Sequence, residues 1–295
     1  LYSCNKTGGR EFPATTVAEV DTVMIDEITM FERIVNDGEF LYAMSSRTDS
    51  SLFIYSLPEL KFIASGLPKG QGPGEVQYGP LPANSNTRGV WMLGFTPGEL
   101  RRFELCKDSI VAVDTAHFGQ IMIVNDLTVL NDSVALFNEF PACCEIYRMT
   151  AGNSSTKSFK YSNEKVTGSN SPNRASFASN SKISAIVFSY IDKIIFLDPN
   201  TLQVIKTAGN GTSLNSEQTG GLPFYSAARA TTDAIYVQKV VSENNAVIEI
   251  YDNDGNPVRQ IQIPIATNTF TVDETNKCLI LYSDDQPDRF FRVKI

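Results

Sequence analysis

The sequence predicts an all-β protein, a six-bladed β-propeller whose blades are four-stranded antiparallel sheets. A short β-forming run recurs about every fifty residues along the 295-residue chain, and a second apolar run follows each copy within about ten residues. Between these runs, no segment has the apolar periodicity of an amphipathic helix of even three turns. One repeated β unit of this length is typical of a propeller blade.

The first runs define the second strand of each predicted blade. They begin at Gly38, Arg88, Asp132, Lys182, Asp233 and Lys277 and read GEFLYAMS, RGVWMLGF, DSVALFNE, KISAIVFS, DAIYVQKV and KCLILYSD. The apolar runs that follow them are the predicted third strands, SLFIYSL, ELRRFEL, CCEIYRM, KIIFLDP, AVIEIYD and RFFRVKI.

An outer and an inner strand complete each unit. In LFIYSLPELKFIAS and IEIYDNDGNPVRQIQI, a tight turn rich in Pro, Asn, Asp and Gly leads into the outer strand. Short runs such as TMFERIV, LTVL and YSAARAT precede the units as inner strands.

The two ends of the chain are expected to share the last blade. The sixth unit reaches Ile295 after its third strand, while an unassigned alternating strand, TTVAEVDTVMI, precedes the first unit. This N-terminal strand would complete the sixth blade and remove an exposed sheet edge. We therefore expect one propeller domain over residues 15–295. A β-sandwich is the main structural alternative, and the regular period favours the propeller.

Composition narrows the classes of partner. Hydrophobic residues make up 42% of the chain, which is enough for a large core, and the net charge is -8. An acidic surface argues against non-specific binding to nucleic acids or anionic membranes. No run of 18 apolar residues occurs, so no spanning helix is expected. We expect a monomer.

The N-terminus predicts a lipid anchor. LYSC matches the end of a bacterial lipoprotein signal, so Cys4 would carry the lipid and residues 1–14 would form the signal remnant and a polar tether. The alternative is an ordinary cysteine in a frayed terminus. Lipidation would place the protein in the bacterial cell envelope, periplasmic or surface-exposed, and would leave the domain itself outside the membrane.

The other cysteines match no zinc-site spacing. They are Cys106, Cys143, Cys144 and Cys278. We expect buried free thiols, and in an oxidising compartment a disulfide between Cys106 and one of the vicinal pair is the alternative.

The stretch SGLPKGQGPGEVQYGPLP is rich in glycine and proline, but it is not a phosphate-binding loop. Pro73 interrupts the glycines, no Lys-Ser or Lys-Thr pair follows, and the next segments are predicted strands rather than a helix. We interpret it as the crossing from the first blade to the second. AGNGTSLNSEQTGGLPF repeats the pattern between the fourth and fifth units, so Glu75 and Gln77 correspond to Glu217 and Gln218.

These features resemble a known family. GQGPGE, Gly70 to Glu75, together with the lipobox-like Cys4 and the polar tether, resembles the TolB-like six-bladed propeller lipoproteins of Gram-negative gut anaerobes. The resemblance covers nearly the whole chain from about Thr15 onward. It implies a surface or periplasmic lipoprotein and carries over no catalytic residues.

Motifs for catalysis are sparse. The one histidine, His117, is interpreted as a surface or inter-blade residue, and no G-x-S-x-G elbow occurs. DNDGN, Asp252 to Asn256, has the start of a calcium loop but lacks the later glutamate, so it is interpreted as a hairpin turn. Arg101, Arg102 and Trp91 are expected in packing and blade-to-blade salt bridges. No cofactor is predicted, and calcium is the one that the sequence leaves open.

The predicted binding surface is one face of the ring. In a four-stranded meander, the crossings between blades and the turns between second and third strands emerge on the same face. The carboxylates expected there are those of Asp49, Glu75, Glu99, Glu139, Asp192, Glu217, Glu243, Asp284, Asp285 and Asp288. Arg47 and Lys69 are the few basic residues placed beside them. The alternative is an acidic rim that only aids solubility.

The leading functional hypothesis is a membrane-anchored binding module. Its ligand, a protein or a carbohydrate, would lie on the acidic face, with no catalytic residue. The candidate ligand-binding residues are Glu75, Gln77, Tyr78, Glu99, Glu217 and Gln218. The alternative is a metal-dependent propeller hydrolase or lyase that works at the axial opening.

Overall fold

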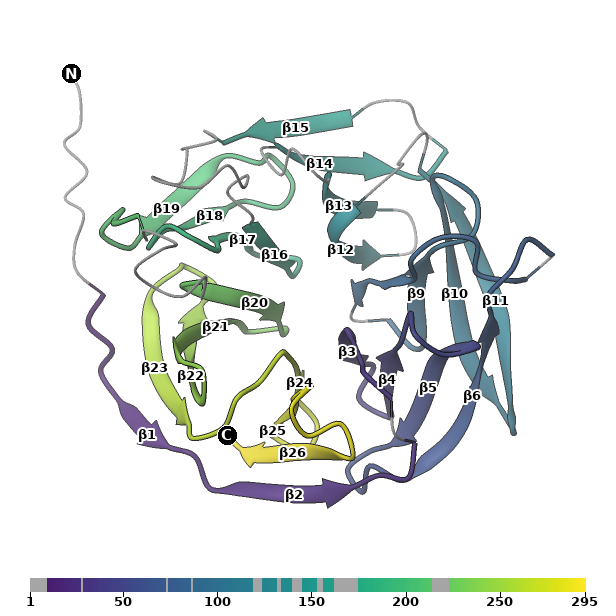
Figure 1. Cartoon of the computed structure of the whole chain (residues 1–295). Coiled ribbons are helices and arrows are strands. Elements are labelled where there is room, and N and C mark those ends of the chain that lie inside the picture. Colours follow the sequence, from purple (N-terminus) through teal and green to yellow (C-terminus); the bar gives the residue numbers. More distant parts are fainter. Residues whose placement is uncertain are drawn as a thin grey trace.

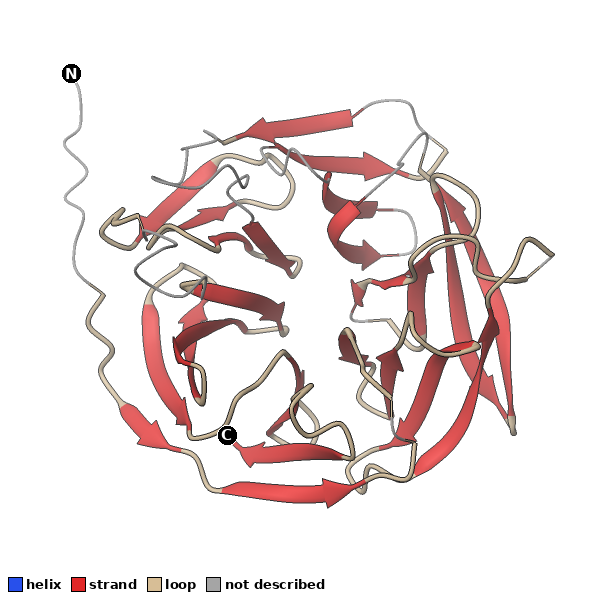
Figure 2. Cartoon of the chain, in the orientation of Figure 1, coloured by secondary structure: helices blue, strands red, loops and turns tan. Residues whose placement is uncertain are grey.

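The chain folds into six small antiparallel sheets arranged in a ring around a central axis (Figure 1). This computed structural model describes residues 10–27, 29–72, 74–85, 87–118, 124–131, 134–139, 145–152, 156–161, 175–213 and 223–295. Figure 2 shows strands joined by loops, and no helix occurs among these residues. The predicted six-bladed propeller is confirmed.

Each of the first three blades is a meander that runs outward from the axis. Blade 1 consists of β3 (Arg33–Asn36), β4 (Phe40–Met44), β5 (Ser50–Ser56) and β6 (Phe62–Pro68). Blade 2 consists of β7 (Leu81–Pro82), β9 (Val90–Leu93), β10 (Glu99–Cys106) and β11 (Ser109–His117). Blade 3 consists of β12 (Val124–Asn131), β13 (Val134–Glu139), β14 (Glu145–Thr150) and β15 (Thr156–Lys160), and β8 (Asn84–Ser85) adds a short parallel strand beside β12.

The other three blades repeat this order. Blade 4 consists of β16 (Ala175–Ser179), β17 (Ser184–Phe188), β18 (Ile194–Leu197) and β19 (Val204–Ala208). Blade 5 consists of β20 (Tyr225–Ala230), β21 (Ala234–Ser242), β22 (Asn245–Asp252) and β23 (Pro257–Ile263). Blade 6 consists of β24 (Thr269–Asp273), β25 (Cys278–Tyr282), β26 (Arg289–Lys294) and β2 (Val20–Met24).

The predicted N-terminal strand is divided between two blades. β2 pairs antiparallel with β26 and completes blade 6, as expected. β1 (Thr15–Val17) instead lies parallel to β23 as an extra outer strand of blade 5. In Figure 1 the two strands follow the outside of the ring, with purple β2 next to yellow β26. The ring is therefore closed by backbone hydrogen bonds between the two ends of the chain.

Contacts with the propeller begin before the predicted domain boundary. The Arg10 side chain is only 8% exposed and lies beside Glu249 and Asp192 of neighbouring blades. Phe12 packs edge-on against Tyr251. The division between a tether over residues 1–14 and the domain stays a prediction.

The core is a ring of six apolar clusters, one between each pair of neighbouring blades. Alternate residues of one strand enter different clusters: in β4, Leu41 and Ala43 pack toward blade 6, whereas Tyr42 and Met44 pack toward blade 2. Both faces of each sheet are thus buried. This explains why the second strands are continuous apolar runs rather than alternating ones.

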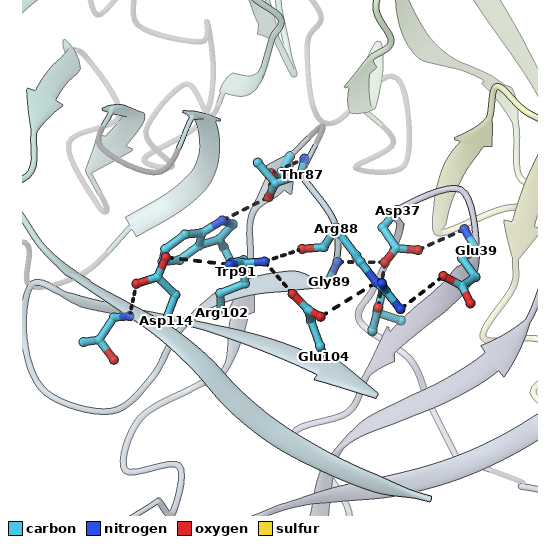
Figure 3. A network of polar contacts seen from close by, with 12 residues as sticks. Asp37, Glu39, Thr87, Arg88, Gly89, Trp91, Arg102, Glu104 and Asp114 are labelled. Carbon is cyan, nitrogen blue, oxygen red and sulfur yellow. Dashed lines mark hydrogen bonds and ion pairs between the residues drawn. The ribbon is translucent and has the colours of Figure 1, made fainter. Parts of the chain in front are cut away.

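A polar network holds the seam between blades 1 and 2 (Figure 3). The Asp37 carboxylate accepts a hydrogen bond from the Gly89 backbone N–H at 2.7 Å. Arg88 lies 3.6 Å from Glu39 of blade 1 and 3.7 Å from Glu104 of blade 2. Gly89 has φ +78°, and a Cβ there would lie 2.4 Å from the carbonyl oxygen of residue 103, so this close approach requires glycine.

The two neighbouring arginines of β10 point to opposite faces of their sheet. Arg101 lies over Phe95 in the cluster toward blade 1, and Arg102 lies near buried Trp91 in the cluster toward blade 3. The ion pair across the seam between blades 1 and 2, however, is made by Arg88 rather than by either of them.

Several smaller expectations are settled by the fold. Cys278 is buried and free, as predicted, but Cys106 is exposed and free, because it ends β10 at the hairpin with β11. Cys143 and Cys144 lie outside the described residues. DNDGN is the turn between β22 and β23, and His117 is exposed at the end of β11. Among the described residues, no helix is long and apolar enough to cross a membrane.

Candidate functional site

The loops expected on one face do lie together, and we call this surface the loop face. The crossing from blade 4 to blade 5 bonds to the second turn of blade 4, through Phe224 N–H and the Ser189 carbonyl at 2.6 Å. Asn268, in the crossing from blade 5 to blade 6, accepts a hydrogen bond from Asp284 N–H at 2.6 Å. Crossings and turns between second and third strands therefore meet, as the meander requires.

Glu75 faces back into its own loop. Its carboxylate accepts a hydrogen bond from Gly72 N–H at 2.7 Å. A Cβ on Gly70 would lie 1.9 Å from the same carboxylate oxygen. The glycines of GQGPGE thus make room for the Glu75 side chain, and the interpretation of this stretch as a structural corner between β6 and β7 is confirmed.

Gln77 and Tyr78 fasten the same crossing to blade 2. Their backbone N–H groups both donate to the Gly94 carbonyl, at 2.7 Å and 3.0 Å. Gly94 has φ +131°, and a Cβ there would lie 3.2 Å from Val76. Both side chains are exposed, Tyr78 by 57%, so they are free to contact a ligand.

The remaining predicted residues lie elsewhere. Glu99 is only 8% exposed and is paired with Arg101 in its own strand. Glu217 and Gln218 lie outside the described residues. The structure thus brings Glu75, Gln77 and Tyr78 together on the crossing from blade 1 to blade 2, while Glu99 packs in blade 2. Whether any of them binds a ligand stays a prediction.

Several loop-face carboxylates have basic partners. Asp192 pairs with Arg10, and Asp288 lies 2.8 Å from the Arg289 side chain. Burial raises the pKa of Asp284, with Arg47 opposing the shift and Glu32 reinforcing it. The acidic character of this face is therefore reduced locally by ion pairs that the sequence pattern did not reveal.

A cavity of about 270 Å³ lies on the loop face where the inner strands meet. Its walls come from the starts of the inner strands of five blades and from nearby loops. Its polar lining consists of Glu32, Arg33, Asp126, Ser176, Ser189, Tyr190, Tyr225, Ser226, Arg229, Asn268 and Thr269. We call this the axial cavity, and none of the predicted site residues that the structure describes lines it.

Arg33 and Asp126 form an ion pair across the axial cavity, from blade 1 to blade 3. Asp126 is 4% exposed, and its second carboxylate oxygen accepts a hydrogen bond from Phe177 N–H of blade 4 at 3.1 Å. Three inner strands are thereby connected around one buried carboxylate.

Arg229 is the most deeply buried cation of the cavity, with 6% exposure. Its guanidinium donates to the Ala228 carbonyl at 2.7 Å and to Thr269 Oγ1 at 3.2 Å, while its Nε has no hydrogen-bond partner among the described residues. Burial, reinforced by repulsion from Arg33 and opposed by Asp126, lowers the pKa of Arg229 to about 10. The side chain stays charged at neutral pH.

Two further hollows adjoin Arg229 and the axial cavity. Arg229 also lines a cavity of about 170 Å³ formed by the far ends of the inner strands, so its side chain separates the two ends of the axis. A groove of about 270 Å³ between blades 5 and 6 shares Pro223, Ser226 and Asn268 with the axial cavity. Gln238 in this groove is fully buried, and its Oε1 has no partner in the described part of the chain.

No metal-binding cluster is evident. Within the described ranges, no three His, Cys, Asp or Glu side chains are grouped as a metal ion requires. Calcium binding therefore stays an untested expectation.

Charged residues within the predicted inner strands are a signal in the sequence for the axial cavity. Arg33 in TMFERIV and Arg229 in YSAARAT are charged residues inside short inner strands. Inner strands line the axis of a propeller, so a charged side chain there has few ways to reach bulk solvent except along the axis. Such residues are candidates for a site.

Comparison with known proteins shows the fold alone. No protein-family model and no curated protein matches this sequence. A member of the DUF4221 family from Bacteroides vulgatus superposes with a TM-score of 0.60 at 9% identity, covering 94% of this chain and 98% of that chain. The WD40 repeats of RRP9 superpose with a TM-score of 0.58 at 11% identity, covering 96% of this chain and 99% of that one. The structure of U3-55K superposes with a TM-score of 0.57 at 9% identity, covering 94% of this chain and 98% of that chain.

Proposed function

We propose that this protein is a binding module that holds its ligand on the loop face, at the axial cavity. The observation that carries the proposal is the convergence of inner strands from five blades on one polar cavity. Ligands often bind where several elements of a rigid scaffold meet, with a few polar groups fixing their orientation. The exposed side chains of Gln77 and Tyr78 would extend this surface toward blade 2.

The test is a binding screen with a matched pair of blocking variants. Glycans and peptides are screened against the full chain by thermal unfolding, because a ligand that binds only the folded state raises the midpoint. Ser176→Phe fills the axial cavity, and Thr232→Phe places the same side chain at the cavity at the other end of the axis. We expect binding that Ser176→Phe abolishes and Thr232→Phe leaves intact. Ligands that bind both variants equally would contradict the proposal.

We also propose that the chain is a TolB-like propeller lipoprotein of the bacterial cell envelope, anchored through Cys4. Support comes from the LYSC motif and from the resemblance carried by GQGPGE. The protein would be membrane-associated in cells, and Cys4→Ser would release it, whereas Cys106→Ser would not. Mass spectrometry of the N-terminal peptide should find a lipid on Cys4; an unmodified cysteine in membrane-associated protein would contradict the anchor.

We propose that binding needs no metal cofactor. The carboxylates of Glu75, Glu99 and Asp288 already have partners within the protein. The unfolding midpoint measured with calcium should therefore equal the midpoint measured with a chelator. A calcium-dependent rise that Glu75→Gln and Glu217→Gln abolish would instead favour the metal-dependent hydrolase or lyase.

A further inference from the structure

Arg229 lacks an anionic partner. None of the ion pairs between described residues includes it; Asp126 is paired with Arg33, and the Arg229 guanidinium lies over the Phe270 ring, 5.6 Å from its centroid. A guanidinium has five N–H donors arranged to bind a carboxylate through two parallel hydrogen bonds. With its Nε unpartnered and only 6% of the residue exposed, Arg229 has unused donor capacity in a site shielded from water. An uncompensated buried charge is costly unless a ligand completes it.

The pairing of the charges in the cavity lining favours an anion at Arg229. The lining carries two arginines and two carboxylates, so its formal charge is balanced. Asp126 is paired with Arg33, and Glu32 accepts hydrogen bonds from Ser46 and lies 4.0 Å from Arg47, which leaves the Arg229 guanidinium without an ion-pair partner among the described residues. The loop face around it carries carboxylates such as Glu243 and Asp285, which line the adjoining groove. A ligand with several negative charges would be repelled by this rim. A ligand with a single carboxylate on a neutral body suits both the cavity at Arg229 and the acidic groove beside it.

The adjoining groove contains two buried side-chain oxygen atoms, Gln238 Oε1 and Ser226 Oγ, that have no hydrogen-bond partner among the described residues. The Gln238 side-chain NH₂ is already used, since it donates to the Thr267 carbonyl and hydroxyl at 2.7 Å each. The groove therefore offers an acceptor that a ligand hydroxyl would satisfy. Ser226 lines both hollows, so the groups of the axial cavity and of the groove adjoin each other there.

We propose that the axial cavity and the adjoining groove bind an acidic sugar, with the carboxylate on Arg229 and the hydroxyls on Ser226 and Gln238. This inference rests on the proposed function and specifies its ligand class. A sugar acid combines one carboxylate with several hydroxyl donors on a neutral ring, which matches the unpartnered groups of both hollows.

The probe is D-glucuronate, compared with D-glucose and acetate at constant ionic strength. Isothermal titration calorimetry on the full chain measures the three affinities. We expect glucuronate to bind at least about tenfold more tightly than either control, because only it engages both hollows. Equal affinity for glucose would overturn the role of the carboxylate, and equal affinity for acetate would overturn the role of the sugar ring.

Two variants and a matched control test the residues. Arg229→Met should weaken glucuronate binding by about 30-fold or more, since it removes a buried charged hydrogen-bond donor. Ser226→Ala removes one hydroxyl and should weaken binding about three- to tenfold. Arg88→Met removes an arginine from the polar network between blades 1 and 2 that lines neither the axial cavity nor the adjoining groove, and it should not change binding. Unchanged binding in Arg229→Met, with its folding verified by circular dichroism, would overturn the inference.

The outcomes separate this inference from the proposed function. If glucuronate fails to bind but another ligand binds and is blocked by Ser176→Phe, the sugar assignment is wrong and the binding module stands. If no ligand is sensitive to Ser176→Phe, both are wrong.

Discussion

At the scale of single residues, the axial arginine shows how a binding site can oppose stability. Arg229 carries its charge inside the ring, with Arg33 nearby and Asp126 already engaged. Apolar residues would suit such a position better in the absence of a ligand, because burial penalises the charged form. A buried charge that the fold compensates only in part, through Asp126 and the Phe270 ring, points to a role in binding.

Arg229→Met is therefore expected to stabilise the unliganded protein. Removing a buried charge that is compensated only in part should raise the free energy of unfolding by about 1 kcal/mol and the unfolding midpoint by about 2 °C. Thermal unfolding at neutral pH measures the change, with Arg88→Met as the surface control. A fall of several degrees in the unfolding midpoint would instead mean that contacts within the native ring fully compensate the charge of the guanidinium.

Asp198 illustrates a carboxylate that stabilises a turn. Its Oδ1 accepts hydrogen bonds from Thr201 N–H at 2.7 Å and from Asn200 N–H at 2.9 Å. The bond from the Thr201 backbone is the largest cause of its lowered pKa, and slight burial opposes the shift. Because the folded pKa lies below the unfolded one, the stabilisation is present above about pH 4 and disappears as the pH falls through the folded value.

Asp198→Asn keeps the acceptor oxygen but removes the charge. We expect a loss of about 0.5 kcal/mol at pH 7, small because the site is near solvent. The difference should shrink as the pH falls through the folded pKa of Asp198 and vanish once the carboxyl group is protonated. Urea titrations at pH 7 and at a series of acidic pH values test this, and a difference that persists after protonation would show that charge is not the cause.

At the scale of elements, the crossing between blades 1 and 2 is stabilised by its own glutamate. GQGPGE was predicted to be a corner from its glycine and proline content, and the structure adds the reason for the particular glycines. Gly70 and Gly72 lie against the Glu75 carboxylate, which occupies the space of a missing Cβ at Gly70. The stability of this corner therefore depends on Gly70 and Glu75 together, because the carboxylate can reach the Gly72 N–H only where residue 70 has no Cβ.

A double-mutant cycle tests this pairing. Gly70→Ala should displace the Glu75 carboxylate and cost about 1 kcal/mol, the value of the hydrogen bond to Gly72. Glu75→Ala should cost a similar amount, and the double variant should cost little more than either, because each change breaks the same contact. Strict additivity in denaturant unfolding would contradict this account.

At the scale of the whole molecule, stability depends on ring closure. Blade 6 takes its outer strand from residues near the start of the chain, so β2 and β26 join segments far apart in sequence. Contacts between blades are apolar clusters on every side, so opening one seam exposes the edge strand β26 and loosens its neighbours.

Removal of residues 1–24 should therefore open the ring. We expect the unfolding midpoint to fall by about 10 °C or more and the transition to become less cooperative. Adding a peptide of residues 10–24 in excess should restore part of the loss by mass action, and a scrambled peptide should not. A truncated chain as stable as the full one would show that closure by β2 is dispensable.

The repeat, the number of blades and the closure of the last blade by an N-terminal strand could all be predicted from the order of residues. Apolar runs at a regular interval suffice for this, because each blade must bury both faces against its neighbours. The candidate site, in contrast, is visible only in the folded ring. Arg33, Asp126 and Arg229 are separated by about a hundred residues each, and their charges meet because inner strands converge on one axis. The partners of Glu75 and Glu99 likewise became visible only in three dimensions, since a carboxylate looks the same in sequence whether it is free or already bonded.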